Sequence, residues 1–92
     1  MHRSAYHLAQ RAVTDLKQAV LEVIINGPER GISNAELGKN LGIHEGHVGH
    51  EGHITRTILS MLEEEGVVKQ EDESKLWKLK RTDGLNLQKE DS

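Results

Sequence analysis

The sequence predicts a single small domain that is mainly α, with three helices followed by a β-hairpin. Apolar residues recur at spacings of three and four in separate stretches, which is the period of an amphipathic helix. Nearer the C-terminal end, apolar residues alternate with lysines, as in a half-buried strand. The chain has 92 residues, which suits one domain, and its core must be aliphatic because Tyr6 and Trp77 are its only aromatic residues.

The first helix is predicted over residues 5–25. Asn26, Gly27 and Pro28 end it, because glycine favours the C-terminal cap and proline cannot continue a helix. A helix of this length exceeds so small a core, so about its first two turns are expected to project as an N-terminal extension, residues 1–11. The extension is either a dimerisation helix that forms a homodimer or a loosely packed N-terminus. The predicted apolar stripe consists of Leu8, Ala12, Leu16, Ala19, Val20, Val23 and Ile24.

The second helix is predicted over residues 34–41. Ser33 is a good N-cap, and Glu36 three residues later completes a capping box. Gly42 supplies the left-handed residue that ends the helix. Just before Ser33, Ile32 is expected to form a very short strand that pairs with the later hairpin.

The third helix is predicted to begin at Gly52 or His53 and to end at Glu65. On a helical wheel, its apolar side is expected to pack inward, and this side consists of Ile54, Ile58, Met61 and Leu62. The opposite, polar side consists of His53, Arg56, Thr57 and Ser60.

The hairpin is predicted from a strand at 67–70, a turn at 71–74 and a return strand at 76–80. In the return strand, Trp77 and Leu79 share one face, while Lys78 and Lys80 share the other. Trp77 is expected to be at least partly buried. The polar residues 81–92 are expected to form a disordered tail, which leaves residues 12–80 as the domain.

Two helices joined by a turn and followed by a hairpin resemble the winged helix-turn-helix superfamily, over residues 12–80. The resemblance implies three helices plus a two- or three-stranded wing. It also implies that the third helix binds double-stranded DNA, in a small transcriptional regulator or an accessory DNA-recognition domain. The expected base-contacting residues are His53, Thr55, Arg56, Thr57 and Ser60. The expected backbone contacts are Lys39, Lys75 and Lys78.

The charge distribution leaves an alternative function open. The net charge is −3, whereas DNA-binding domains are usually basic. Residues 75–81 form a basic strip, but acids concentrate at residues 63–65 and 71–73. The acidic hairpin turn would repel phosphate if it touched the DNA backbone. The alternative is therefore a protein–protein interaction module in a larger assembly.

Residues 44–53 read HEGHVGHEGH, with a histidine at every third position. Neutral imidazole is a good ligand for zinc, nickel or copper. The glycines work against the fixed geometry that such a site needs, so the tract is predicted to be an elongated turn that binds no metal. A further interpretation is a pH response, because neighbouring histidines repel one another once protonated below about pH 6.5. The histidines are His44, His47, His50 and His53.

Several other classes of protein are disfavoured. The chain has no cysteine, so disulfides and thiolate zinc sites are impossible. No apolar run reaches the roughly 20 residues of a membrane span, and no signal-peptide pattern occurs, so we expect a cytoplasmic protein without membrane contact. Phosphate-binding loops, serine elbows and cysteine nucleophiles are also absent from the sequence, so we expect neither an enzyme nor a cofactor.

Overall fold

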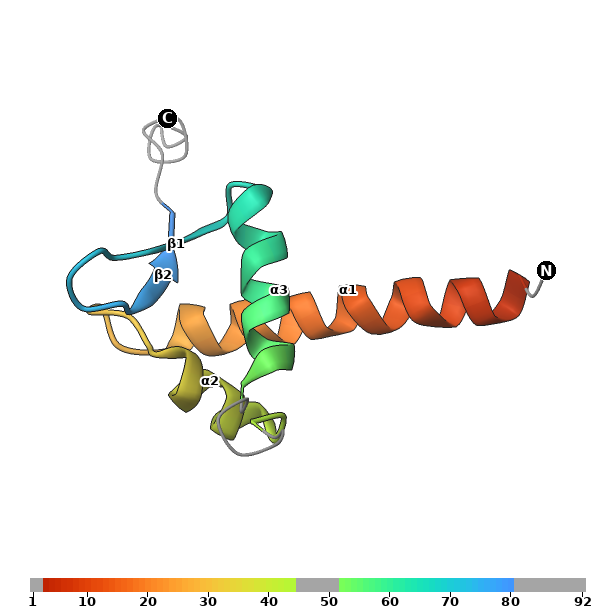
Figure 1. Cartoon of the computed structure of the whole chain (residues 1–92), viewed down its shortest axis with the longest axis horizontal. Helices are drawn as coiled ribbons and strands as arrows, with labels where there is room; N and C mark the ends of the chain where they lie inside the picture. The colour runs from red at the N-terminus through yellow and green to blue at the C-terminus, as the bar shows by residue number, and fades with distance from the viewer. Residues whose placement is uncertain (1–2, 45–51, 81–92) are drawn as a thin grey trace.

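The computed structural model describes residues 3–44 and 52–80, and it contains three helices followed by a two-stranded antiparallel sheet (Figure 1). This arrangement confirms the predicted mainly α fold with a small hairpin. Each element lies within two residues of its predicted bounds. The elements are α1 (Arg3–Asn26), α2 (Asn34–Leu41), α3 (His53–Glu64), β1 (Val68–Gln70) and β2 (Trp77–Leu79).

Local hydrogen bonds define both ends of α2. The Ser33 hydroxyl accepts a hydrogen bond from the Glu36 N–H at 3.0 Å, and the Glu36 carboxylate accepts one from the Ser33 N–H at 3.4 Å. At the other end, Gly42 adopts the left-handed conformation, with φ 73°. Both predicted caps are confirmed, and the Ser33 cap fixes the start of α2, which borders the groove described below.

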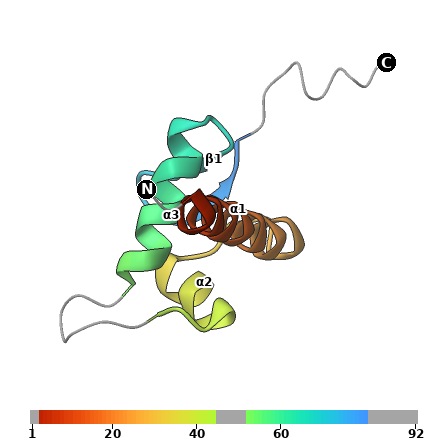
Figure 2. The ribbon, with the colours of Figure 1, turned by 90° about the vertical axis from the view of Figure 1, so that its right-hand side faces the viewer.

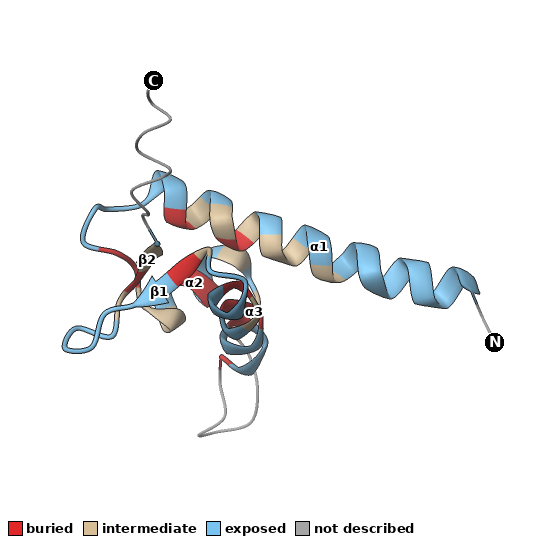
Figure 3. Cartoon of the chain, turned by 90° about the horizontal axis from the view of Figure 1, so that it is seen from above, coloured by how far each residue is buried: buried red, intermediate tan, exposed pale blue. Residues whose placement is uncertain are grey.

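The core lies where the C-terminal half of α1 meets the other elements. Figure 2 looks along α1 from its N-terminal end, and α1 contacts α2, α3 and β2. Figure 3 shows the buried residues gathered at this junction. Each helix and each strand contributes to it, as does the segment before α2. The buried apolar residues are Val20, Ile24, Ile32, Leu37, Ile58, Leu59, Leu62, Val68 and Trp77.

The hairpin is tied to the segment before α2. Ile32 and Trp77 form an antiparallel bridge, in which each N–H donates to the other's carbonyl, at 2.9 and 2.8 Å. The predicted pairing of Ile32 is therefore confirmed. Gly31 precedes this bridge with φ +102°, and a Cβ there would lie 2.7 Å from the Trp77 carbonyl oxygen, so only glycine fits. Trp77 is buried, with 6% of its surface exposed, as predicted.

The N-terminal part of α1 projects beyond the rest of the molecule (Figure 3). Every residue from 3 to 12 is exposed. We call this segment the arm, and we call the described chain from residue 13 onward the body. The exposed part of α1 reaches to residue 12, one residue beyond the expected extension. Leu8 and Ala12 were predicted to be part of a buried stripe, but both are exposed because the body no longer covers α1 there.

Three of the predictions lie wholly or mostly outside the described residues. They concern residues 1–2, the tail at 81–92 and the greater part of the histidine tract, at 45–51. Within the described residues, none of the helices combines the length and the apolar character needed to cross a membrane.

Candidate nucleic-acid interface

The inward side of α3 differs from the one predicted. Thr55 is fully buried, while Ile54 is 47% exposed. Thr55 was expected to contact DNA and Ile54 to pack inward, and both expectations are wrong. The buried residues are Thr55, Ile58, Leu59 and Leu62, which follow the spacing of one helix face.

Close packing of α2 against α3 explains this rotation of the helix. Gly38 lies opposite Thr55, and a Cβ on Gly38 would be 2.7 Å from the Thr55 Oγ1 atom. At this crossing there is room only for small side chains, so threonine occupies it and the larger Ile54 is turned outward. The run Thr55, Ile58, Leu59, Leu62 was available in the sequence as a sign of this face.

The polar side of α3 is exposed as predicted. His53, Arg56, Thr57 and Ser60 are all exposed. The Thr57 hydroxyl donates a hydrogen bond to the His53 carbonyl oxygen at 2.9 Å. Because its hydrogen is engaged there, Thr57 presents to solvent a hydroxyl acceptor and a methyl group.

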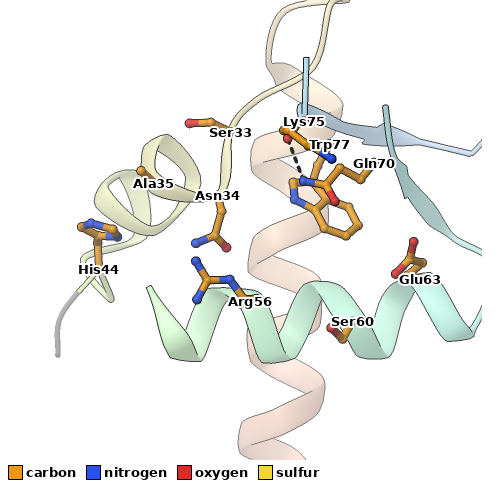
Figure 4. Close-up of a pocket in the computed structure, with 10 residues that line it drawn as sticks. All are labelled: Ser33, Asn34, Ala35, His44, Arg56, Ser60, Glu63, Gln70, Lys75 and Trp77. Atoms are coloured by element: carbon orange, nitrogen blue, oxygen red, sulfur yellow. Dashed lines mark hydrogen bonds between the residues drawn. The ribbon is translucent and has the colours of Figure 1, made fainter. Parts of the chain in front are cut away.

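This polar side borders an open groove of about 450 Å³ (Figure 4). The start of α2 forms one wall, α3 forms the second, and the hairpin forms the third. Arg56 extends from α3 toward Asn34 at the start of α2, while Glu63 lies at the hairpin end of the same helix (Figure 4). The lining residues are Ser33, Asn34, Ala35, His44, Arg56, Ser60, Glu63, Gln70, Lys75 and Trp77.

The groove carries positive charge on two of its walls. Within residues 3–44 and 52–80, the one ion pair is between Lys17 and Glu65, at 2.5 Å, so Arg56 and Lys75 are not neutralised by salt bridges there. Lys75 has φ +64°, a left-handed conformation that is uncommon for a residue other than glycine. Its N–H donates to the Glu71 carbonyl oxygen, and its own carbonyl accepts from the Gln70 side chain at 3.0 Å.

The other two predicted lysines lie outside the lining of the groove. Lys39 is exposed on α2, one turn beyond Ala35, and so continues the α2 wall. Lys78 pairs with Lys69 across the hairpin, while Trp77 pairs with Gln70. Because side chains alternate along a strand, Lys78 lies on the hairpin face opposite Trp77. The structure therefore separates Lys78 from the groove.

Several lining residues were not predicted. Asn34 donates to the Gly52 carbonyl oxygen at 3.4 Å and so joins the start of α2 to the N-cap of α3. His44 is half-buried. Three buried polar atoms at this junction have no hydrogen-bond partner among the described residues: Asn34 Oδ1, His44 Nδ1 and Thr55 Oγ1. Only the spatial meeting of α2 and α3 brings these residues together.

The histidine tract is only partly described. In residues 3–44 and 52–80, no group of three or more histidine, aspartate or glutamate residues could hold a metal ion. His47 and His50 lie outside these ranges, so the interpretations of the tract as a metal site or pH sensor stay untested.

A scan against protein-family models, a search of curated proteins and a search of solved structures each found no match. The candidate site, defined by its geometry, consists of the groove together with the exposed side of α3.

Proposed function

We propose that this chain is a DNA-binding domain of the winged helix-turn-helix type, which inserts the N-terminal half of α3 into the major groove. It would serve as a transcriptional regulator or as an accessory DNA-recognition domain. One observation carries the proposal: the exposed side of α3 borders the same open groove as the start of α2 and Lys75 of the hairpin. A recognition helix flanked by two backbone-contacting walls is the docking arrangement of this class of protein.

Arg56 and its neighbours supply the chemistry for reading base edges. An arginine can donate two hydrogen bonds to the O6 and N7 atoms of guanine. Thr57 offers an acceptor and a methyl group, which suits contact with a base amino group or a thymine methyl. Ser60, one turn beyond Arg56, can donate or accept.

The charges along α3 restrict how DNA can approach. Glu63 is seven residues beyond Arg56, about 10 Å along the helix axis. Phosphates must therefore lie toward the N-terminal half of α3, away from Glu63 and the following acids. Lys39 on the α2 wall and Lys75 on the hairpin wall flank that half, and they can position the duplex without reading its sequence.

A protein partner is the second candidate, and the hairpin turn favours it. Glu71, Asp72 and Glu73 are all exposed there. This acidic turn suits a basic protein surface better than a phosphate backbone. In that case the domain would act as an interaction module within a larger assembly.

Salt-dependent DNA binding separates the two functions. The chain is titrated against a mixed duplex library at several salt concentrations between about 50 and 200 mM. Each neutralised phosphate contributes about −0.9 to the slope of log affinity against log salt, so Lys39 and Lys75 together give about −2 per domain. A chain that fails to bind any duplex at the lowest salt concentration does not bind DNA, and the protein-interaction function then takes its place.

A further inference from the structure

Asn34 is held between α2 and α3 by its backbone and by its side chain. It is the first residue of α2, directly after the Ser33 cap. Its Nδ2 atom donates to the Gly52 carbonyl oxygen at 3.4 Å, and the Arg56 N–H donates to the same oxygen at 2.9 Å. The Asn34 amide group therefore lies beside the turn of α3 from which the Arg56 side chain extends.

The Gly52 contact fixes which way this amide group is turned. A carbonyl oxygen only accepts hydrogen bonds, so the NH2 side of the amide must face Gly52. Gly52 has φ +84°, and a Cβ on it would lie 2.6 Å from Asn34 Nδ2, so the two residues fit closely. Asn34 Oδ1 is consequently turned away from Gly52, and it is buried without a hydrogen-bond partner among the described residues.

Arg56 can supply the donor that this oxygen lacks. The side chains of Asn34 and Arg56 point toward each other (Figure 4). A guanidinium group carries five N–H donors, and guanine O6 and N7 engage only two of them. Glu63, the acid that lines the same groove, is about two helical turns beyond Arg56. Within the described residues Arg56 forms no ion pair, so its guanidinium group can turn to Asn34 Oδ1.

We propose that Asn34 is a specificity-determining residue that acts through Arg56. Its Oδ1 atom accepts a hydrogen bond from the guanidinium group, and this bond holds the group in one orientation before DNA arrives. The bond gives the buried oxygen a partner, which buried polar groups nearly always have. An arginine that is already oriented loses less side-chain entropy when it binds guanine. This role rests on the DNA-binding function proposed above.

Duplex titrations of Asn34→Ala test the role. At the base pair that Arg56→Ala identifies, the preference for guanine is expected to fall at least about fivefold, because a hydrogen bond to a charged group is lost. Asn40→Ala makes the same change at an exposed position of α2 outside the groove, and it is expected to keep the preference. An unchanged preference in Asn34→Ala overturns the proposal.

The double variant Asn34→Ala with Arg56→Ala shows whether Asn34 acts through the arginine. Once Arg56 is removed, Asn34→Ala is expected to cause no further loss of preference, because it has no guanidinium group left to orient. Additive losses show that Asn34 reads a base by itself, and so does a loss at a different base pair. Either result overturns the proposal.

Asn34→Asp separates the positioning role from the structural bond to Gly52. A carboxylate keeps an acceptor for Arg56 but has no donor for the Gly52 carbonyl. The preference for guanine is expected to be retained, while the added negative charge lowers affinity for every duplex. A preference lost as in Asn34→Ala would assign the effect to the Gly52 bond and overturn the proposal. Urea denaturation confirms that each variant is folded.

A measurement without DNA distinguishes this proposal from the proposed function. Rotation of the Arg56 guanidinium group is measured by NMR in the isotopically labelled full chain. It is expected to be at least about twofold faster in Asn34→Ala than in the parent chain, because the bond to Oδ1 restrains it. Equal rates overturn the role of Asn34 and leave the DNA-binding function standing. A parent chain that binds no duplex overturns both.

Discussion

Gly38 of α2 faces Thr55 of α3 so closely that a Cβ on the glycine would lie 2.7 Å from the threonine Oγ1 atom. The same Cβ would be 3.0 Å from the Cβ atom of His44. This contact sets the distance between the two helices that carry the candidate site. It also decides which side of α3 is left exposed for a partner.

Gly38→Ala is the most direct test of this contact. At an exposed helix position, this change would raise the free energy of unfolding by up to about 1 kcal/mol, because alanine is the better helix former. Here we expect it to lower the free energy of unfolding by about 1–3 kcal/mol, since stiff, fully buried Thr55 cannot move aside. Urea denaturation gives the value.

The double variant Gly38→Ala with Thr55→Ala provides the control for this prediction. Removing the Thr55 hydroxyl relieves the clash, so the double variant should lose less free energy of unfolding than the sum of the losses in the two single variants. Strict additivity would show that the two residues do not oppose each other.

Thr55→Val is expected to raise the free energy of unfolding by about 1 kcal/mol. The Thr55 hydroxyl is buried without a hydrogen-bond partner among the described residues, which costs its desolvation free energy. Valine has nearly the same shape and carries no hydroxyl to desolvate. DNA affinity should stay unchanged, because Thr55 is not accessible to a partner. Thermal and urea unfolding measure the first effect, and duplex titration measures the second. A fall in DNA affinity with unchanged stability would return Thr55 to the interface.

Arg56→Ala is expected to weaken binding to the preferred duplex by about 1–3 kcal/mol and to relax discrimination at one base pair. Binding to random duplex should fall less, because the lost contact reads a base edge. Stability should change little, since Arg56 is exposed and forms no ion pair within the described residues. Competition titrations with preferred and random duplexes measure the ratio of the two affinities. Equal losses on both duplexes would make Arg56 a backbone contact.

Lys75→Gly is expected to separate stability from binding. Glycine adopts the left-handed conformation of Lys75 without steric cost, so the free energy of unfolding should stay within about 1 kcal/mol of the parent. Removal of the charge should lower DNA affinity on all sequences and flatten the salt slope by about one unit. Urea denaturation and salt titration give the two values.

Lys78→Ala is the matched control for Lys75→Gly, because Lys78 lies on the hairpin face opposite Trp77 and away from the groove. Its salt slope should equal that of the parent chain. A slope reduced by Lys78→Ala but not by Lys75→Gly would place the duplex on the other face of the hairpin.

Much of the secondary structure could be predicted because its causes are local. Ser33 and Glu36 bond each other's backbone within one helical turn, so the start of α2 is readable from the sequence. Gly42 ends α2 for an equally local reason. The alternation around Trp77 likewise indicated a strand with a buried face. The exposed polar side of α3 followed from helical periodicity, which does not depend on the partner that covers the opposite side.

The sequence by itself therefore determined the order and bounds of the elements and the outward direction of Arg56 on α3. The tertiary structure alone decided that Thr55 is buried and Ile54 exposed, since that choice depends on how closely Gly38 lets α2 approach. It also decided that Asn34 borders the groove while Lys78 does not. Capping and periodicity act over a few residues, whereas the lining of a groove depends on packing between elements that are distant in the chain.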